Sequence, residues 1–172
     1  METLAAAAGI LLNGSEKFSA IGNKKSAGTK LVCFDSFFNN PGVYEIEMGT
    51  PMKKVLYDIG GGFKEDIKAL QIGGPLGGVI PIAEAEKLNL DFQEFTTAGF
   101  MLGHASIVSI PKDFPMVEYI HHLFEFTAEE SCGKCFPGRI GSYRGKEMFD
   151  QLKSKKAKIP LKVLNDLLIT MK

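Results

Sequence analysis

A short amphipathic helix with both ends encoded is the feature that most constrains the fold of this chain. In residues 50–62 (TPMKKVLYDIGGG), Thr50 suits the N-cap, and Pro51 suits the first helical position, where its missing N–H donor is not needed. The glycines at 60–62 predict where the helix ends. The apolar positions between these signals recur at helical spacing and predict one buried face: Met52, Val55, Leu56 and Ile59.

Two segments with strand-like alternation precede this helix. Residues 29–37 (TKLVCFDSF) place Val32 and Phe34 on one side, and residues 43–48 (VYEIEM) alternate in the same way. The intervening NNPG predicts a turn, because asparagine and glycine tolerate positive φ and proline fixes its own φ. These segments are expected to form a hairpin against which the helix packs.

Further strands are predicted after the helix. They lie in residues 67–74 (IKALQIGG), 92–96 (FQEFT) and 105–110 (ASIVSI). A hairpin, a helix packed across it and later strands form the element order of a β-grasp fold. We therefore predict an α+β chain with a ubiquitin-like β-grasp domain over residues 29–111.

The segments on either side differ from this domain. Residues 1–28 begin with an alanine-rich helix ending at Asn13-Gly14 and have little core of their own. Residues 112–172 predict an all-α bundle, with a charged break (KSKKAKIP) before its last helix. The apolar positions of its helices are Val117, Ile120 and Phe124, then Tyr143, Met148, Phe149 and Leu152, then Leu161, Leu164, Leu167, Leu168 and Met171.

Composition and charge exclude several classes of partner. Lys+Arg and Asp+Glu are both 20, so the formal net charge is zero, which argues against nucleic acid or an anionic membrane as the main partner. No apolar run is long enough to span a bilayer. Glu2 stands where a signal peptide has basic residues, and three cysteines are too few for a disulfide scaffold. The chain is expected to be cytoplasmic.

The stretch Ser131 to Arg139 (SCGKCFPGR) carries the strongest chemical signal. Cys132 and Cys135 have the spacing of an iron–sulfur loop, but such a loop commonly holds a third cysteine, and Gly138 stands at its place. A zinc site would need two more ligands, and the histidines nearest in the chain, His121 and His122, lie a few turns upstream of the pair. A redox dithiol is a further interpretation. The remaining interpretation is a helix–loop–helix corner with incidental thiols, and spacing alone leaves all four open.

Other small-residue and cysteine positions have structural interpretations. Residues 73–78 (GGPLGG) lack the Lys-Ser/Thr and the following helix of a phosphate loop, so they predict turns in which backbone segments approach closely. Cys33 lies in a predicted strand and is expected to be buried and inert.

The residues around the cysteine pair closely resemble a known family. The stretch ESCGKCFPGRIGSYRG is similar to the cluster loop of the NADH-binding flavoprotein subunit of respiratory complex I and of the equivalent subunits of NAD-reducing hydrogenases and NAD-dependent formate dehydrogenases. The segments ETLAAAAGILLNG and GGPLGGVIP also resemble parts of this family. The residues that match the loop pattern are Glu130, Ser131, Cys132, Gly133, Cys135, Pro137, Arg139 and Gly141.

The resemblance implies a fold, a function and a ligand set. It makes residues 1–28 the end of a flavin domain, with Glu2 near the flavin, 29–111 a soluble-ligand-binding β-grasp domain, and 112–172 a helical domain of the iron–sulfur type. Cys132 and Cys135 match two [4Fe–4S] ligands, Gly138 replaces the third, and the fourth would lie just beyond Lys172.

The same resemblance implies an electron-transfer part of an NADH:acceptor oxidoreductase, working with other subunits of a complex. FMN and NAD belong to the full-length family, whose nucleotide loops would precede Met1, so the chain is not expected to be catalytic alone. The alternative is a non-catalytic interaction or ligand-binding module that no longer holds a cluster.

Overall fold

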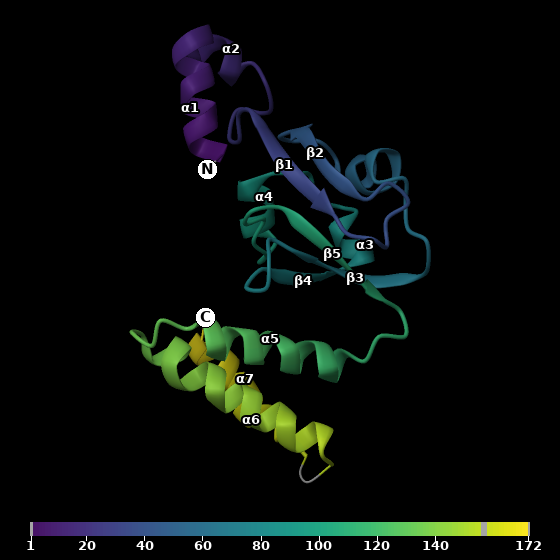
Figure 1. Cartoon of the computed structure of the whole chain (residues 1–172), viewed down its shortest axis with the longest axis vertical. Coiled ribbons are helices and arrows are strands. Elements are labelled where there is room, and N and C mark those ends of the chain that lie inside the picture. The colour runs from purple at the N-terminus through teal and green to yellow at the C-terminus, as the bar shows by residue number, and fades with distance from the viewer. Residues whose placement is uncertain (1, 156–157, 172) are drawn as a thin grey trace. The chain divides into compact units, whose positions relative to one another are not determined.

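The chain divides into two compact units, which are described separately. The computed structural model describes residues 2–155 and 158–171 (Figure 1). Residues 1–112 form the unit that we call the sheet unit, and residues 113–172 form the helical unit. Part of the charged break expected before the last helix, at 156–157, lies outside the described residues.

The sheet unit is built on one five-stranded sheet in the order β2-β1-β5-β3-β4. The central pair, β1 and β5, is parallel, while β1–β2, β3–β4 and β3–β5 are antiparallel. The predicted hairpin is confirmed, with Thr29 opposite Glu47 and Phe34 opposite Gly42. The strands are β1 (Thr29–Phe34), β2 (Gly42–Glu47), β3 (Ile67–Ile72), β4 (Gly78–Pro81) and β5 (Ser106–Pro111).

The helix after the hairpin is present, but it begins differently from the prediction. It winds mainly as a π-helix, η1 (Lys54–Ile59). Thr50 is not its N-cap: the cap position is Lys53, and no side chain caps the helix. The Thr50 hydroxyl donates to the carbonyl of Glu47 at 2.7 Å. The predicted glycine stop is confirmed: Gly61 and Gly62 have positive φ, and the Gly62 amide donates to the Leu56 carbonyl at 3.0 Å.

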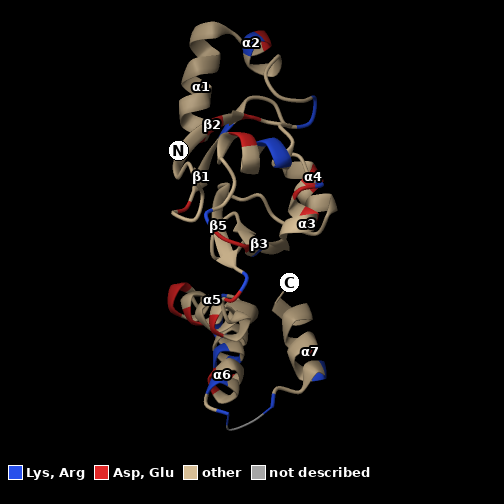
Figure 2. Ribbon diagram, turned by 90° about the vertical axis from the view of Figure 1, so that its right-hand side faces the viewer, with Lys and Arg blue, Asp and Glu red and all other residues tan. Residues whose placement is uncertain are grey.

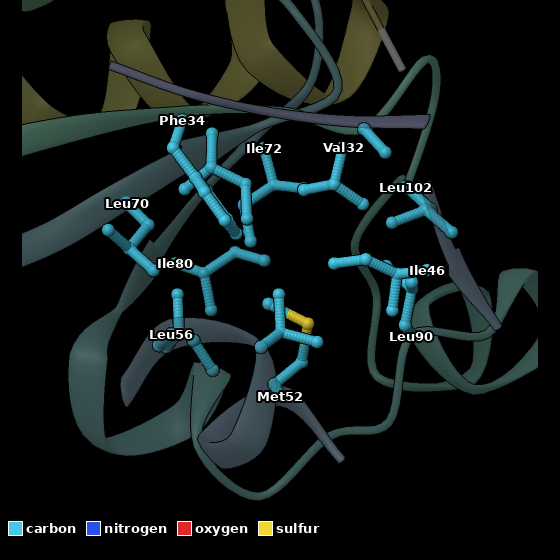
Figure 3. Packing of buried hydrophobic residues seen from close by; sticks show 14 of the residues in the cluster. Val32, Phe34, Ile46, Met52, Leu56, Leu70, Ile72, Ile80, Leu90 and Leu102 are labelled. Carbon is cyan, nitrogen blue, oxygen red and sulfur yellow. The ribbon is translucent and has the colours of Figure 1, made fainter. Parts of the chain in front are cut away.

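The core of the sheet unit lies between η1 and one face of the sheet. Met52 and Leu56 point from the helical segment toward the side chains of the strands (Figure 3). Both are fully buried, as is Val32 on β1. Alternation in β1 is as predicted, because Val32 and Phe34 are buried while Leu31 is exposed and Cys33 is half-buried rather than buried.

The predicted strand at FQEFT is wrong. These residues begin α4 (Phe92–Thr97), a helix whose N-cap, Asp91, accepts a hydrogen bond from the Glu94 amide at 2.9 Å. Phe95 is fully buried from this helix. The strand that completes the sheet is instead β4, and the short helix α3 (Ile82–Ala85) follows it.

The N-terminal residues are attached to the sheet unit through polar contacts. The predicted helix α1 (Glu2–Asn13) ends before Gly14, as expected, and has no buried residue. It is followed by α2 (Ser15–Ser19). The Glu2 carboxylate pairs with Lys30 and accepts from the Leu31 amide at 2.9 Å, which ties the start of α1 to β1.

The helical unit is a helix hairpin followed by a further helix. Its main contact packs Phe124 against Phe149, with ring centroids 5.6 Å apart. Gly145 permits this approach, because a Cβ there would lie 2.2 Å from the Phe124 ring. The elements are α5 (Met116–Glu130), the π-helical turn η2 (Pro137–Gly141), α6 (Ser142–Lys153) and α7 (Leu161–Met171).

The buried face of α5 differs from the predicted stripe. Phe124 is buried as predicted, but Val117 is exposed and Ile120 is only partly buried. The polar residue His121 is buried instead. Its burial is stabilised by Asp150 on α6, because His121 Nε2 lies 2.7 Å from a carboxylate oxygen of that residue. Within residues 2–155 and 158–171, no helix combines the length and apolar character needed to cross a membrane.

Candidate cysteine-loop site

The two cysteines lie at the turn of the helix hairpin. Helix α5 ends at Glu130, and a continuous helical run over residues 136–153 starts directly after Cys135. Cys132 and Cys135 are both free thiols and both exposed. The sequence prediction that the pair follows the end of a helix is confirmed, and the hairpin presents both sulfurs to solvent.

Hydrogen bonds donated by backbone amides hold this loop in shape. The Gly133 amide donates to Ser131 Oγ at 3.2 Å, and Gly133 adopts a positive φ of 70° that a residue with a side chain rarely adopts. The Gly138 amide donates to Cys135 Sγ at 3.4 Å, and the Arg139 amide donates to the Cys135 carbonyl at 3.0 Å. The Cys135 sulfur therefore takes a capping role at the start of the helical run.

Gly138 faces the cysteine loop. A Cβ at this position would lie 3.2 Å from Cys135 Sγ and 2.9 Å from Ser131 Oγ. The Gly138 carbonyl is itself held, because Ser142 Oγ donates to it at 2.5 Å. A side chain at position 138 would thus point at the sulfur, which is the direction that a third ligand of a shared cluster needs.

The residues present do not fit a four-thiolate cluster. In the described part of the chain, no three His, Cys, Asp or Glu side chains gather closely enough to hold a metal ion. His121, considered as a further ligand, is bonded through Nε2 to Asp150, and its Nδ1 lies 3.5 Å from Lys153 Nζ. The two cysteine sulfurs are therefore half of the donor set that such a cluster requires, and Gly138 supplies no ligand.

Charged residues lie in and next to the cysteine loop in the chain, and an ion pair joins the two helices of the hairpin. Lys134 lies between the two cysteines in the chain and Arg139 follows Cys135 by four residues, and both side chains are exposed. Farther along, Glu125 on α5 pairs with Lys146 on α6 at 2.8 Å. The hydrogen bond and charge of each partner lower the pKa of Glu125 and raise the pKa of Lys146, so this ion pair persists across the neutral range.

Glu2, the predicted flavin-proximal residue, lies in the sheet unit. Burial raises the pKa of its carboxyl, but hydrogen bonds from Lys30 and the Leu31 amide and the charge of Lys30 outweigh burial and leave the pKa below its usual value. The carboxylate is thus ionised at neutral pH and fully engaged with β1. In this arrangement it fastens α1 to the sheet.

The glycine loop at 73–78 forms tight turns, as predicted. A Cβ at Gly77 would lie 2.0 Å from the Ile72 carbonyl oxygen, and one at Gly74 would lie 2.4 Å from the His104 ring. Gly73 and Gly74 also have positive φ. Close backbone approach explains these glycines without any bound phosphate.

Comparison with known proteins finds relatives of this chain. Residues 118–172 match the family described as the NADH-ubiquinone oxidoreductase-F iron-sulfur binding region. The chain is 35% identical over 154 residues to the NADP-reducing hydrogenase subunit HndC of Solidesulfovibrio fructosivorans, covering 88% of this chain and 31% of the relative. It is 38% identical over 144 residues to an NADH-quinone oxidoreductase subunit of Escherichia coli, covering 82% of this chain and 32% of the relative.

The predicted resemblance to the NADH-binding flavoprotein subunits is confirmed. Among solved structures, an NAD⁺-reducing [NiFe]-hydrogenase in the air-oxidized state contains a similar chain, with a TM-score of 0.78 and 28% identity. That match covers 89% of this chain and 26% of the hydrogenase chain. The chain thus spans about a third of the length of the curated relatives it matches, and it resembles a mixed α/β portion of these subunits.

Sequence reasoning located the cysteines and Gly138 but missed the apolar surface beside them. Phe136, Ile140 and Tyr143 are 59%, 45% and 55% exposed, and they follow one another at spacings of four and three residues. The same spacing in the sequence was the signal for a common helix face. Periodicity does not distinguish an exposed face from a buried one, so this stripe required the structure.

Proposed function

We propose that this chain is the C-terminal portion of an NADH:acceptor oxidoreductase subunit, the part that carries electrons onward from FMN, here with an incomplete set of cluster ligands. The observation that carries the proposal is the helix hairpin that presents Cys132 and Cys135 with Gly138 facing the same loop. The matched iron–sulfur region over residues 118–172 supports it.

The proposal includes a division of the chain into parts. Residues 1–28 are the end of a flavin domain, 29–111 a β-grasp domain and 112–172 a helical iron–sulfur-type domain. The strand order β2-β1-β5-β3-β4, with a parallel central pair and η1 packed on one face, supports the β-grasp assignment. The compact units meeting at 112/113 support the second boundary.

The proposed partners are other subunits of an electron-transfer complex. The relatives are named as subunits of quinone oxidoreductases and hydrogenases. FMN and NAD would be bound by other parts of such a protein, so this portion alone would not oxidise NADH. A cytoplasmic location agrees with three free cysteines.

Placing a cysteine at the third ligand position, 138, tests the proposal. The chain is incubated anaerobically with ferrous iron, sulfide and a thiol reductant, and compared with the Gly138→Cys variant. We expect little bound iron in the original chain and a brown protein in the variant, with visible absorbance that bleaches on reduction. The reason is that the added sulfur would lie beside Cys135 and raise the number of protein thiolates to three.

The matched control adds a thiol elsewhere. Gly9 lies on α1 with no atom within 4 Å of a Cβ, so Gly9→Cys adds a cysteine without steric cost. This variant is expected to remain as colourless as the original chain. Equal iron uptake by both variants, or none by Gly138→Cys, would contradict the proposal that this loop is a cluster cradle.

A non-catalytic interaction module is the second candidate. The exposed apolar side chains of α7 favour it, since Leu161 is 76% exposed and no residue of this helix is buried. Figure 2 draws most of α7 in tan, because Lys162 and Asp166 are the only charged residues of this helix. A folded Gly138→Cys variant that binds no iron would favour this candidate.

A further inference from the structure

Helix α7 forms one wall of an apolar groove in the helical unit. The opposite wall is the helical run over residues 136–153. Gly141 lets α7 come close to this run, because a Cβ there would lie 3.0 Å from Met171 Cγ. The groove has a volume of about 310 Å³, and its apolar lining includes Phe136, Ile140, Met148, Val163, Leu167 and Met171.

Much of the apolar surface around this groove is uncovered within the helical unit. Leu161 and Ile169 of α7 are largely exposed, and no residue of α7 is buried. Phe136 on the opposite wall is also exposed. An amphipathic helix of a folded protein normally buries its apolar stripe, and contiguous exposed apolar surface is typical of a protein–protein contact.

The length of the groove matches an α-helix as its occupant. The α7 wall runs from Val163 to Met171, which at 1.5 Å per residue is about 12 Å. Apolar residues at positions i, i+3, i+4 and i+7 of a second helix extend over about 10.5 Å along one face. Binding of such a face in a groove between helices is a recurring mode of recognition. The groove therefore suits about two turns of an amphipathic helix.

Lysines gather at one end of this groove. Residues 153–162 (KSKKAKIPLK) contain five lysines and no acidic residue. A smaller hollow of about 110 Å³ shares Val163 with the groove and is also lined by Lys158. Lys158 and Lys162 are exposed, and in the part of the chain that the structure describes no carboxylate pairs with either. Figure 2 shows lysines in blue on the chain that leads into α7 and at the start of this helix.

The charges around the groove define the chemistry of its occupant. Ammonium groups without a carboxylate partner favour acidic residues on an incoming helix, through Coulomb attraction. Arg144 contributes less, because Glu147 already pairs with it at 3.0 Å. Asp166 also lines the groove, so the carboxylates of the occupant belong at the lysine end. The negative charge of Asp166 also opposes nucleic acid or an anionic lipid surface in this place.

We propose that this groove binds an acidic amphipathic helix of a partner protein. The apolar residues of that helix lie between α7 and Ile140, and its carboxylates pair with Lys158 and Lys162. Burial of apolar surface supplies most of the affinity, and the exposed ion pairs fix the orientation of the helix. This inference goes beyond the proposed electron-transfer role, because it holds whether or not the cysteine loop binds a cluster.

Peptide binding to the full chain tests the proposal. The probe is a fluorescent synthetic peptide of about 14 residues, with leucine at i, i+3, i+4 and i+7, glutamate in its first turn and alanine elsewhere. Fluorescence anisotropy is expected to give a dissociation constant below about 100 µM at low salt. A peptide with glutamine in place of glutamate should bind about tenfold more weakly, as should one with its leucines distributed around the helix. Salt at about 0.5 M should remove most of the difference between the glutamate and glutamine peptides.

Matched variants locate the binding on the chain. Ile140→Glu places a charge in the groove and should weaken peptide binding about tenfold, whereas Val117→Glu, at an exposed position of α5 outside the groove, should not. Lys158→Glu should weaken binding about fivefold, and Lys24→Glu in the sheet unit should leave it unchanged. Circular dichroism checks the fold of each variant. Because Lys158→Glu changes only an exposed side chain, it keeps the test decisive if Ile140→Glu does not fold.

Four outcomes would overturn the proposal. They are no peptide binding at low salt, equal binding of the glutamate and glutamine peptides, an affinity that neither Ile140→Glu nor Lys158→Glu changes, and a doubling of molar mass that Ile140→Glu reverses, which would assign the groove to a second copy. Sedimentation with phosphatidylserine vesicles in place of peptide binding is the form that the first outcome takes if the surface binds a membrane. Failure here differs from failure of the proposed function, because that function is tested by iron uptake in Gly138→Cys and this inference by peptide binding to the original chain.

Discussion

The sheet unit and the helical unit differ in how much of each is buried. All residues of the main hydrophobic cluster lie in the sheet unit, between Val32 and Ile107. The helical unit buries mainly Phe124, Ala128, Met148 and Phe149, and its last helix buries nothing. The candidate site nevertheless lies in the helical unit, which has the smaller core. The comparison teaches that the larger hydrophobic core and the candidate site occupy separate parts of this chain.

The largest expected effect tests whether stability resides in the sheet unit. Leu56→Ala removes a fully buried side chain and should lower the free energy of unfolding of this unit by about 2–5 kcal/mol. Urea denaturation followed by circular dichroism measures the loss. The control, Leu161→Ala on exposed α7, should change stability by less than about 0.5 kcal/mol. Equal losses in the two variants would erase the contrast between the units.

The second prediction tests the contact that holds the helix hairpin together. Gly145→Ala places a Cβ 2.2 Å from the Phe124 ring, so α5 and α6 must separate, at a cost of about 1–3 kcal/mol. Hydrogen exchange should show faster exchange in these helices and unchanged exchange in β1 and β5. The matched variant Gly9→Ala meets no atom and should stabilise α1 by up to about 1 kcal/mol. Faster exchange throughout the chain would show that the units unfold together.

The third prediction concerns acid stability of the sheet unit. Burial raises the pKa of Asp91, but hydrogen bonds from Asn23, the Glu94 amide and Ser26 hold it below its usual value. The contribution of the ionised Asp91 carboxylate to the free energy of unfolding is therefore present above about pH 4 and is lost as the pH falls through the lowered pKa.

Asp91→Ala gives this prediction a measurable form. The variant should cost about 1 kcal/mol at neutral pH through loss of the α4 N-cap. The difference from the original chain should shrink in acid, as measured by urea titrations at several pH values. A difference that stays constant down to about pH 2 would contradict the role of the ionised carboxylate.

The smallest effect concerns a surface contact between η1 and α3. Burial, followed by the 2.5 Å hydrogen bond to Glu86, raises the pKa of Tyr57 to about 12. The contribution to stability is present below about pH 10 and is lost as the pH rises toward about 12. Ultraviolet titration should resolve one of the four tyrosines as late to ionise. Glu86→Gln should move that step toward the ordinary pKa, and an unchanged titration would refute the coupling.

Sequence reasoning succeeded where local pattern and packing agree. Alternation placed Val32 and Phe34 correctly, and Gly60–Gly62 ended the helix as expected. It failed at FQEFT because the β propensity of Phe and Thr outweighed a helix-start signal that was present, Asp91 followed three residues later by Glu94. It failed at Thr50 because η1 begins later, with Lys53 at the cap position and no capping side chain.

The residues of the candidate site could be predicted from the sequence, but the direction of a side chain at position 138 could not. The motif singled out Cys132, Cys135 and Gly138 from their neighbours in the chain. The direction in which a side chain at 138 would point depends on the π-helical turn that follows Cys135, and no spacing rule predicts that turn. His121 was missed on the buried face because its partner, Asp150, comes from another helix.

The parallel pairing of β1 with β5 has a consequence for synthesis. Cys33 pairs with Ser106, so the centre of the sheet joins segments more than seventy residues apart. A nascent chain that has emerged only as far as β4 has the hairpin and η1 but lacks the strand that connects the two edges of the sheet. Until β5 leaves the ribosome, the growing polypeptide exposes apolar side chains of the kind that chaperones bind. A chain whose synthesis stopped before residue 106 would therefore be prone to aggregate.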